Sequence, residues 1–455
     1  MLGVFKSSSS AAVDVISNVV PVRIRINEIC SREWIRIISL AETHPLRRML
    51  ESRNPFFEGA GKGSPLGYMC HVTRDLRKNL IDKNLRVKVQ EKISPESILN
   101  QIEVETLEIF PVAVGSSSNR TKAQEQLARG AFNSFYEGIS PDSLLAFTDG
   151  SVLGSACVGN GGYGVVLHKK NEDPLIISGS VGRMTDNVNC ELRGIIEALK
   201  LMVVKCSSDN SITKIFVFTD CRSAMDILAK QNNAHKRLTE LKEVWSSLER
   251  LKALNIDLKL VWIPGHADIL GNELADVAAK KGSLIKCDEE TFEEISEQVL
   301  FGWVKERVLK RWGERWSSAD SGAWTRQFLK DVGKKLSFPK DRNSGMVYAR
   351  ALLNNAAVAD NMFRMGLSDS TDCNCGEGRE TVDHILLECS LESEARGKLQ
   401  NEIGDIWMNN KKSGGLQFSL TTILNPAALP NINQDDSFLI MSSVFNFFKN
   451  LSKKI

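Results

Sequence analysis

The sequence predicts an α/β fold built on a mixed sheet of five strands with flanking helices, followed by a mainly helical C-terminal region. Between residues 143 and 282, short apolar runs alternate with longer stretches in which apolar residues recur every three or four positions. These two patterns are typical of buried strands and amphipathic helices. From residue 286 onward the sequence is rich in tryptophan, with helical stretches such as RWGERW, and then carries three cysteines and a histidine close together.

The pattern of apolar residues predicts the order of strands and helices in the sheet region. Three strands come first and form a meander, joined by a glycine-rich, turn-like connection over residues 154–164. A strong helical stripe follows in ELRGIIEALKLMVVK, and then strands alternate with helices up to Gly282, a typical helix end. The predicted strands are 144–149, 163–170, 174–182, 214–220 and 258–266, and the predicted helices are 191–205, 221–231, 238–254 and 272–282.

The first 140 residues carry weaker signals. Residues 19–26, VVPVRIRI, are expected as a strand, and a helical pattern follows it. Residues 50–75 are rich in Gly, Pro and Asn and are expected as loop. The polar stretch GSSSNRTKAQEQ suits a linker or the start of a helix.

Composition indicates an intracellular globular protein, with nucleus or cytoplasm left undetermined. The 455 residues suffice for two or three domains, and 42% hydrophobic with 25% charged residues is ordinary. No apolar run approaches the length of a membrane span, so no membrane partner is expected. Asp14 interrupts the N-terminal apolar stretch, which argues against a secretory signal. Ten irregularly spaced cysteines without such a signal argue against a disulfide scaffold.

One segment is distinctly basic. Residues 301–350 contain twelve Lys or Arg against five Asp or Glu, with four tryptophans interleaved. This excess fits a phosphate-rich partner. Basic helices with aromatic core residues are equally common, so both interpretations stay open here.

Carboxylates stand where strands and helices of the predicted sheet meet. Asp149 and Asp220 each end a strand with the same letters, Phe-Thr-Asp. Glu191 begins the striped helix, and Asp276 lies early in the last helix. Strand ends collect functional side chains at one edge of an α/β sheet. Four converging acids would repel one another unless a cation neutralised them, and hard ions such as Mg²⁺ prefer oxygen ligands.

Each acid also has an ordinary structural interpretation. A single Asp after a strand is more often a turn former or a helix cap. Glu191 and Asp276 taken alone would be unremarkable helix residues, and a lone His266 after Pro-Gly would be a polar loop residue. Only the combination predicts a site for two divalent cations about 4 Å apart, an arrangement that supports phosphodiester hydrolysis.

Four motifs, in order, resemble type 1 ribonuclease H domains: TDGS at 148–151, NCELRGIIEAL at 189–199, FTDCRSAM at 218–225 and WIPGHADILGNELAD at 262–276. The last looks like the form found in non-LTR retrotransposon polyproteins. The resemblance implies a ribonuclease H-like fold and hydrolysis of the RNA strand of an RNA–DNA hybrid, leaving a 5′-phosphate and a 3′-hydroxyl. It places the metal-binding acids, for two Mg²⁺ or alternatively Mn²⁺ ions, on Asp149, Glu191, Asp220 and Asp276, and the assisting histidine on His266.

The same resemblance implies where the hybrid is held. Ser151 and Asn187 lie where the family places polar contacts to the substrate. Val188 departs from the family, which often has Asn or Gln at this position. Some relatives also carry a basic helical protrusion before the last strand, for which HKRLTELKEVWSSLERLKALN is too short. Hybrid affinity is therefore expected to depend on flanking domains.

A second constellation lies in CNCGEGRETVDHILLEC, where Cys373, Cys375, His384 and Cys389 are spaced C-x-C-x8-H-x4-C. Three thiolates and one imidazole form a standard tetrahedral zinc set. His384 and Cys389 are five residues apart, so they would not share one face of an ideal helix without a bend or a helix end. The stretch resembles the Cys/His motif at the end of non-LTR retrotransposon polyproteins, which implies a structural Zn²⁺.

The expected organisation is a connector-like region at 1–140, a ribonuclease H domain at 141–285, a basic Trp-rich helical region at 286–370, and the zinc motif with C-terminal helices at 371–455. The resemblance covers about residues 25–400 and includes no polymerase signature, so other polyprotein domains are expected as partners. Three functions compete: an active hybrid-specific ribonuclease, a catalytically weak nucleic-acid-binding remnant, and a transposase or integrase. The PGH…AD ending argues against the third.

Overall fold

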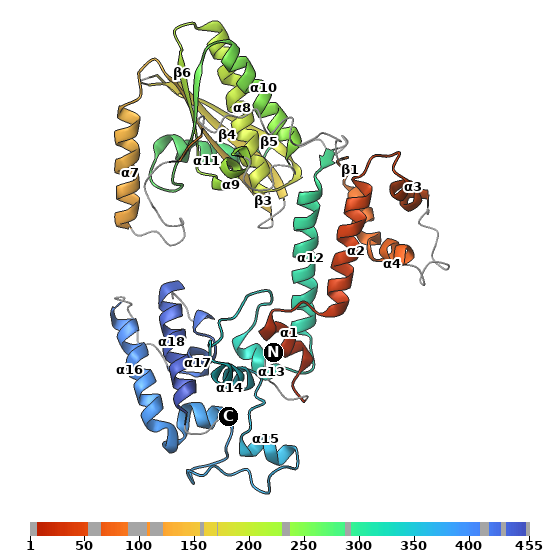
Figure 1. Cartoon of the computed structure of the whole chain (residues 1–455), viewed down its shortest axis with the longest axis vertical. Coiled ribbons are helices and arrows are strands. Elements are labelled where there is room, and N and C mark those ends of the chain that lie inside the picture. Colours follow the sequence, from red (N-terminus) through yellow and green to blue (C-terminus); the bar gives the residue numbers. More distant parts are fainter. Residues whose placement is uncertain are drawn as a thin grey trace. The chain divides into compact units, whose positions relative to one another are not determined.

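The computed structural model describes residues 7–52, 65–89, 107–109, 122–154, 159–170, 172–229, 237–286, 293–409, 418–428 and 434–451. The chain divides into two compact units: Asn27–Glu306, called the sheet unit here, and Met1–Ile26 with Arg307–Ile455, called the helical unit. The boundaries between them fall within α2 (Val22–Ile38) and α12 (Glu297–Ser317) (Figure 1). The domain boundaries expected at residues 140, 285 and 370 stay predictions.

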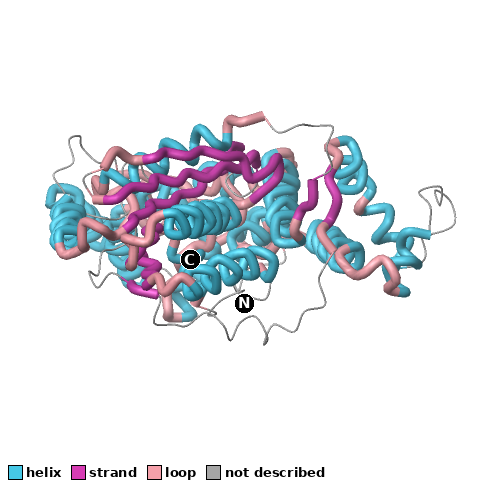
Figure 2. The backbone as a smooth tube through the Cα atoms, turned by 90° about the horizontal axis from the view of Figure 1, so that it is seen from above, coloured by secondary structure: helices cyan, strands magenta, loops and turns pink. Residues whose placement is uncertain are grey.

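The sheet unit is built on one mixed sheet (Figure 2). The five predicted strands are present as β3 (Leu144–Gly154), β4 (Gly159–Lys169), β5 (Leu175–Thr185), β6 (Lys214–Thr219) and β7 (Asp257–Trp262). The first three form an antiparallel meander, and β6 and β7 add in parallel beside β3. A sixth, short strand that the sequence did not indicate, β2 (Leu107–Ile109), pairs with β7, so the order is β2-β7-β6-β3-β4-β5.

The glycine-rich stretch expected as a turn-like connection is largely strand. Residues 159–164 belong to β4 and pair with both β3 and β5, whereas residues 155–158 lie outside the described part. The glycines are needed because α11 (Leu270–Ser283) lies directly on this strand. A Cβ at Gly164 would overlap the backbone of Ala275 and Ala279, and one at Gly162 would overlap Ser283. Close backbone approach, and not a turn, explains the glycines.

Helices cover both faces of the sheet, so that the sheet is the middle one of three layers. Alternation along β3 sends Leu144 and Ala146 to one face and Leu145 and Phe147 to the other. The first face is covered by α8 (Asn187–Ser208), α9 (Arg222–Leu228) and α10 (Leu238–Ala253). The second face is covered by α11 and by α7 (Lys122–Glu137), which supply Ala275 and Phe132 to its hydrophobic cluster.

The remaining elements of the sheet unit are α3 (Pro45–Ser52), α4 (Pro65–Val72), α5 (Arg74–Asp82) and β1 (Leu85–Val87), which pairs in parallel with β8 (Glu293–Ile295). The strand expected at 19–26 is wrong, because α2 begins at Val22. Pro21 precedes the first turn, where its fixed φ suits a helix, and its carbonyl accepts from the Arg25 amide. The loop expected at 50–75 is wrong for residues 50–52, 65–72 and 74–75, which are helical, and residues 53–64 lie outside the described residues.

The helical unit has its own hydrophobic core. Trp312, Trp316 and Tyr348 lie at its centre. Besides part of α12, it contains α1 (Ser10–Ser17), α13 (Ala323–Phe328), α14 (Arg342–Leu352), α15 (Ala359–Arg364), η4 (His384–Glu388), η5 (Ser390–Glu392), α16 (Ser393–Asn409), α17 (Leu420–Leu424), η6 (Pro426–Ala428) and α18 (Gln434–Asn450). The mainly helical C-terminal region is thereby confirmed.

Three of the four tryptophans of the basic segment, Trp312, Trp316 and Trp324, pack in this core. The indole nitrogen of Trp316 donates to the Leu329 carbonyl at 2.7 Å, and that of Trp324 donates to the Ala351 carbonyl at 3.0 Å. Rings held in this way are not offered for stacking on bases, whereas lysines such as Lys334 and Lys335 are exposed. Across both units, no helix in the described ranges has the length and apolar character needed to cross a bilayer.

Candidate active site

The two Phe-Thr-Asp repeats lie side by side in the sheet. β3 and β6 are parallel neighbours, with Phe147 opposite Phe218 and Thr148 opposite Thr219. The repeats are therefore in register, and Asp149 and Asp220 follow matching positions on adjacent strands. Trp262, at the end of β7, donates from its indole nitrogen to the Asp220 carbonyl at 3.0 Å and holds the turn after β6.

Glu191 reaches the same point from α8. The helix begins after Asp186, whose carboxylate caps it by accepting from the Asn189 amide at 2.8 Å. The start of α8 lies against β3 so closely that a Cβ on Gly150 would overlap the Glu191 backbone nitrogen. Glu191 is 3% exposed, and one of its carboxylate oxygens, Oε2, has no hydrogen-bond partner among the described residues. The other, Oε1, accepts from Asn187 at 3.3 Å.

Asp149, Glu191 and Asp220 form what we call the acid cluster, whose ligand oxygens lie within 4.8 Å of one another. Burial, followed by the charges of Asp220 and Asp276, raises the pKa of Asp149 from 3.8 to about 8. Burial and the charges of Asp149 and Asp220 likewise raise the pKa of Glu191, and burial raises that of Asp220. An unpartnered buried oxygen among crowded acids fits a hard divalent cation, which would remove the repulsion.

Asp276 lies near the acid cluster but is not a member of it. Its charge raises the pKa values of Asp149 and Asp220, yet its own carboxylate is bound to the Lys280 ammonium at 2.5 Å. Three of the four predicted acids are thus brought together, and the fourth is held beside them by a lysine one helical turn away.

Asn272 and Lys280 were not singled out from the sequence. Asn272 is 3% exposed and donates from Nδ2 to Asp220 Oδ2 at 3.1 Å, which opposes the rise in the pKa of Asp220. Both residues lie four positions from Asp276, one before it and one after it. That spacing places all three on one side of α11, so a search for i±4 partners of Asp276 would have found them.

His266 lies in the turn between β7 and α11, at the edge of the acid cluster. The preceding Gly265 passes so close to Asp220 that a Cβ would overlap its carboxylate. His266 is exposed, and its charge lowers the pKa of Asp220. Its backbone is left-handed, with φ of 52°, and so is that of Asp268, at 53°.

The two expected substrate contacts flank the acid cluster. Ser151 lies on β3 two residues beyond Asp149 and is partly exposed. Asn187 is the first residue of α8 and is exposed, although its amide also supports Glu191. Val188 packs against the hydrophobic cluster beneath α8 and offers no polar group. The positions of Ser151 and Asn187 are compatible with their predicted role, which stays a prediction.

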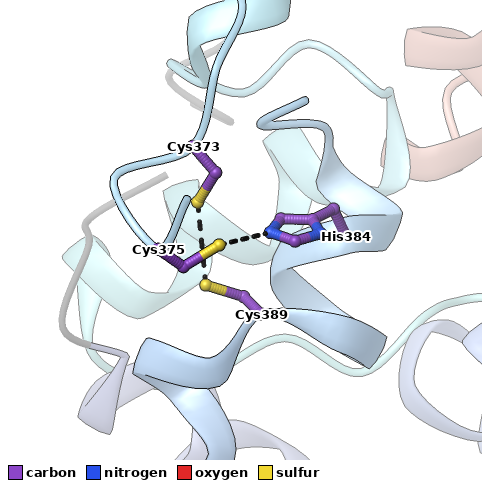
Figure 3. A group of neighbouring side chains, drawn as sticks. All are labelled: Cys373, Cys375, His384 and Cys389. Carbon is purple, nitrogen blue, oxygen red and sulfur yellow. Dashed lines mark hydrogen bonds between the residues drawn. The ribbon is translucent and has the colours of Figure 1, made fainter. Parts of the chain in front are cut away.

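In the helical unit, Cys373, Cys375, His384 and Cys389 converge as the Cys/His cluster (Figure 3). The Cys373 and Cys389 sulfurs are 3.7 Å apart, and the Cys375 sulfur is 3.3 Å from His384 Nε2. Zn–S bonds of about 2.3 Å in a tetrahedron imply sulfur separations of about 3.8 Å. A hydrogen bond from the Glu377 amide lowers the pKa of Cys375 to about 7, which favours the thiolate that a metal needs.

A π-helical turn solves the spacing problem of this cluster. Residues five apart do not share a face of an α-helix, but η4 is a π-helix closed by a bond from the Cys389 amide to the His384 carbonyl at 2.8 Å. The wider turn brings His384 and Cys389 to the same side. The other imidazole nitrogen, Nδ1, lies 3.5 Å from the Glu388 carboxylate, which leaves Nε2 directed at the cluster.

Comparison with known proteins agrees with this architecture. A family model described as RNase H matches residues 141–284. The chain is 31% identical over 144 residues to the ribonuclease H of Actinobacillus pleuropneumoniae, covering 30% of this chain and 88% of that protein. It is also 31% identical over 163 residues to the ribonuclease H of Mannheimia succiniciproducens, covering 35% and 97%.

Two further similarities are to a polyprotein and to a solved structure. A retrovirus-related Pol polyprotein from the type-1 retrotransposable element R1 2 of Nasonia vitripennis is 29% identical over 141 residues. The match covers 30% of this chain and 33% of the polyprotein, so the chain spans about a third of that relative. A solved structure of LC11-RNase H1 in complex with an RNA/DNA hybrid has 21% identity and a TM-score of 0.25, covering 30% of this chain and 97% of that one.

Sequence identity above 30% extends over nearly the whole length of two ribonucleases H. The region that the family model matches contains strands β3 to β7 and the acid cluster. The chain therefore belongs to the ribonuclease H family of hydrolases.

Proposed function

We propose that the chain hydrolyses the RNA strand of RNA–DNA hybrids, using two divalent cations held by Asp149, Glu191, Asp220 and Asp276. The observation that carries the proposal is the convergence of three buried carboxylates, one with an unpartnered oxygen, within the ribonuclease H match. Mg²⁺ or Mn²⁺ bound there would lower the pKa of an attacking water and stabilise charge on the leaving oxygen.

The protein's own groups prepare this centre. Asn272 fixes one oxygen of Asp220, and Asn187 fixes one oxygen of Glu191, so each carboxylate presents its other oxygen in a set orientation. Lys280 compensates the charge of Asp276. Asp276 would be the fourth carboxylate to hold the cations.

His266 and two polar residues act on the substrate. His266 is exposed at the rim, beside Asp220, where it can take up or deliver a proton at the scissile phosphate. Ser151 and Asn187 would contact sugar hydroxyls and phosphates of the hybrid. Recognition of 2′-hydroxyl groups, and not of base sequence, would then distinguish the RNA strand.

A strand-resolved assay tests the substrate. A hybrid labelled on either strand, together with double-stranded RNA and double-stranded DNA, is incubated with the full chain and Mg²⁺. We expect cleavage of the RNA strand of the hybrid alone, leaving 5′-phosphate and 3′-hydroxyl ends. Cleavage of DNA would contradict the assignment. Hybrid binding without cleavage would favour the nucleic-acid-binding remnant.

We also propose a structural Zn²⁺ at Cys373, Cys375, His384 and Cys389. Three sulfur donors and one nitrogen donor within 4.8 Å match zinc in type and number. Cys373 and Cys389 are buried within the core of the helical unit, so a bound ion would fasten the 373–376 turn to that core. No open ligand position remains in this set, which fits a structural role and not a catalytic one.

Zinc content checks this second proposal. The purified chain should carry about one equivalent of zinc by atomic absorption, and Cys375→Ser should lose it. Cys30→Ser is the matched control, because Cys30 is a free cysteine far from the cluster in sequence. Equal zinc in wild type and Cys375→Ser would refute the site.

Finally, we propose that the chain derives from a non-LTR retrotransposon polyprotein. The similarity to the Nasonia vitripennis polyprotein supports this origin, and the Cys/His cluster downstream of the ribonuclease H region agrees with it. Other domains of such a polyprotein would then be natural partners that deliver the hybrid.

A further inference from the structure

Helix α7 (Lys122–Glu137) lies outside the 141–284 region matched by the ribonuclease H family, yet it covers part of the sheet on the α11 side. Phe132 is 5% exposed, and its ring centroid lies 6.1 Å from that of Phe147 and 5.6 Å from that of Phe218. Phe135 packs edge-on against Phe216 and Phe218, at 6.1 and 6.4 Å. Phe147 and Phe218 belong to the two repeats that end in Asp149 and Asp220, two of the three residues of the acid cluster.

The C-terminal end of α7 is anchored to the sheet. Lys170, which directly follows β4, donates from its ammonium to the carbonyls of Tyr136, Glu137 and Ile139 at 3.0, 2.9 and 3.1 Å. A cation at the last carbonyls of a helix satisfies them and complements the helix dipole. The helix is therefore fixed both along its length and at its end.

The same helix supports the His266 loop, residues 263–269. Ile263, Ala267 and Ile269 of this loop are buried in one hydrophobic cluster with Ala128 and Phe132 of α7. Nearby, the Arg129 guanidinium binds the Asp268 carboxylate at 3.1 Å. Three residues of the loop thus pack in a cluster to which α7 contributes, while His266 between them stays exposed beside Asp220.

The loop needs such support because of its backbone. His266 and Asp268 have φ of 52° and 53°, a left-handed conformation that residues other than glycine adopt only at an energetic cost. Two such residues in one turn persist only where the surroundings determine the backbone. The apolar residues on either side of His266 supply that constraint by packing in the cluster.

We propose that α7 is a positioning element for His266, with Phe132 as the central positioning residue and Arg129 as a secondary one. The catalytic role of His266 belongs to the proposed function, on which this inference rests. In this view the working ribonuclease unit begins near residue 122, and α7 holds the histidine in place without touching substrate.

Single-turnover cleavage by the full chain tests the proposal in two backgrounds. Phe132→Ala should slow hybrid cleavage about three- to tenfold when His266 is present, and less than about twofold in a His266→Ala background, because contributions through one shared group are not additive. Leu127→Ala, a 66% exposed position on the same helix, is the matched control and should have no effect. An equal loss in both backgrounds, or no loss at all, would overturn the proposal.

A second measurement does not depend on activity. Amide hydrogen exchange of residues 265–268 should accelerate in Phe132→Ala and stay unchanged in Leu127→Ala; unchanged exchange in both would overturn the inference. An inactive wild type whose loop still responds would refute the proposed function alone.

If Phe132→Ala does not fold, Arg129→Gln is tested in its place. This variant should cleave the hybrid about two- to threefold more slowly than wild type. Arg129→Asp should be slowed as well, and adding Asp268→Arg to Arg129→Asp should restore the rate, because the ion pair is then re-formed with its charges exchanged. No loss in Arg129→Gln would then overturn the proposal.

Discussion

At the scale of single residues, the buried carboxylates of the acid cluster, which are expected to bind metal, lower the stability of the metal-free protein when they are ionised. The raised pKa of Asp149, about 8 instead of 3.8, comes from burial and then from neighbouring charges. The folded chain therefore holds this proton more tightly than the unfolded chain does. Between about pH 4 and pH 8, the free energy of unfolding of the metal-free protein should fall as pH rises. Glu191 and Asp220 act in the same direction.

Asp149→Asn should remove much of this pH dependence. At pH 8 in EDTA, we expect the variant to unfold at least about 2–4 °C above wild type, because it lacks a buried like charge. At pH 5, where Asp149 is protonated in the folded chain, the difference should vanish. Thermal unfolding at the two pH values checks this, and an identical pH slope in both proteins would contradict the repulsion. Mg²⁺ should stabilise wild type more at pH 8 than at pH 5.

Asn272 is expected to tune Asp220. Asn272→Ala removes the hydrogen bond to Asp220 Oδ2, so the carboxylate should protonate more readily and bind cations more weakly. We expect the Mg²⁺ concentration for half-maximal cleavage at pH 7 to rise about tenfold or more, since a bond to a charged group contributes about 1.5–3 kcal/mol. Asn210→Ala, at an exposed turn, is the control. An unchanged Mg²⁺ midpoint would show that Asn272 is only structural.

At the scale of elements, close packing between α11 and β4 fixes the position of Asp276. A methyl group at Gly164 would overlap the α11 backbone, so Gly164→Ala should cost about 1–3 kcal/mol and move Asp276 away from the acids. Gly130→Ala is the matched control, because nothing lies within 4 Å of a Cβ there. That change, within α7, should be neutral or stabilising by about 0.5–1 kcal/mol. Denaturant unfolding of both variants checks the contrast.

Most of the strands and helices that position the acid cluster could be predicted from the sequence. The Phe-Thr-Asp repeats predicted two strand ends with acids, and their register in the sheet makes those acids neighbours. The glycine run predicts a turn but residues 159–164 form a strand, because a turn and a strand packed under a close helix both need glycine, for different reasons. The π-helical turn at His384 could not be predicted either, since the five-residue spacing of His384 and Cys389 indicates only that the helix must bend or end there.

The role of α7 also could not be predicted from the sequence pattern. Residues 115–126 suit a helix start, but nothing local tells that Phe132 packs on Phe147 and Phe218. Likewise, VVPVRIRI has the alternating pattern of a strand. The segment is helical from Val22 because Pro21 precedes the first helical turn and because Trp34 and Ile35 are buried along the same helix. Long-range packing, which sequence periodicity does not report, decided both cases.

At the scale of the whole molecule, the two units have separate hydrophobic cores, so we expect each unit to unfold separately and to be stabilised by its own metal. The acid cluster belongs to the sheet unit and the Cys/His cluster to the helical unit. We expect calorimetry to resolve two transitions, of which Mg²⁺ raises one and Cys375→Ser lowers only the other. A single transition that responds to both changes would show that the units unfold as one.

The central claim is that the acid cluster performs hybrid hydrolysis, and one rate comparison tests it most directly. Cleavage of an RNA–DNA hybrid in Mg²⁺ is measured for wild type, Asp149→Asn and the control Asp173→Asn, an exposed acid between β4 and β5. We expect Asp149→Asn to lose about 10³-fold or more, because an amide weakens both metal binding and charge compensation. Asp173→Asn should stay within about twofold of wild type. Cleavage by Asp149→Asn at the wild-type rate would contradict the account.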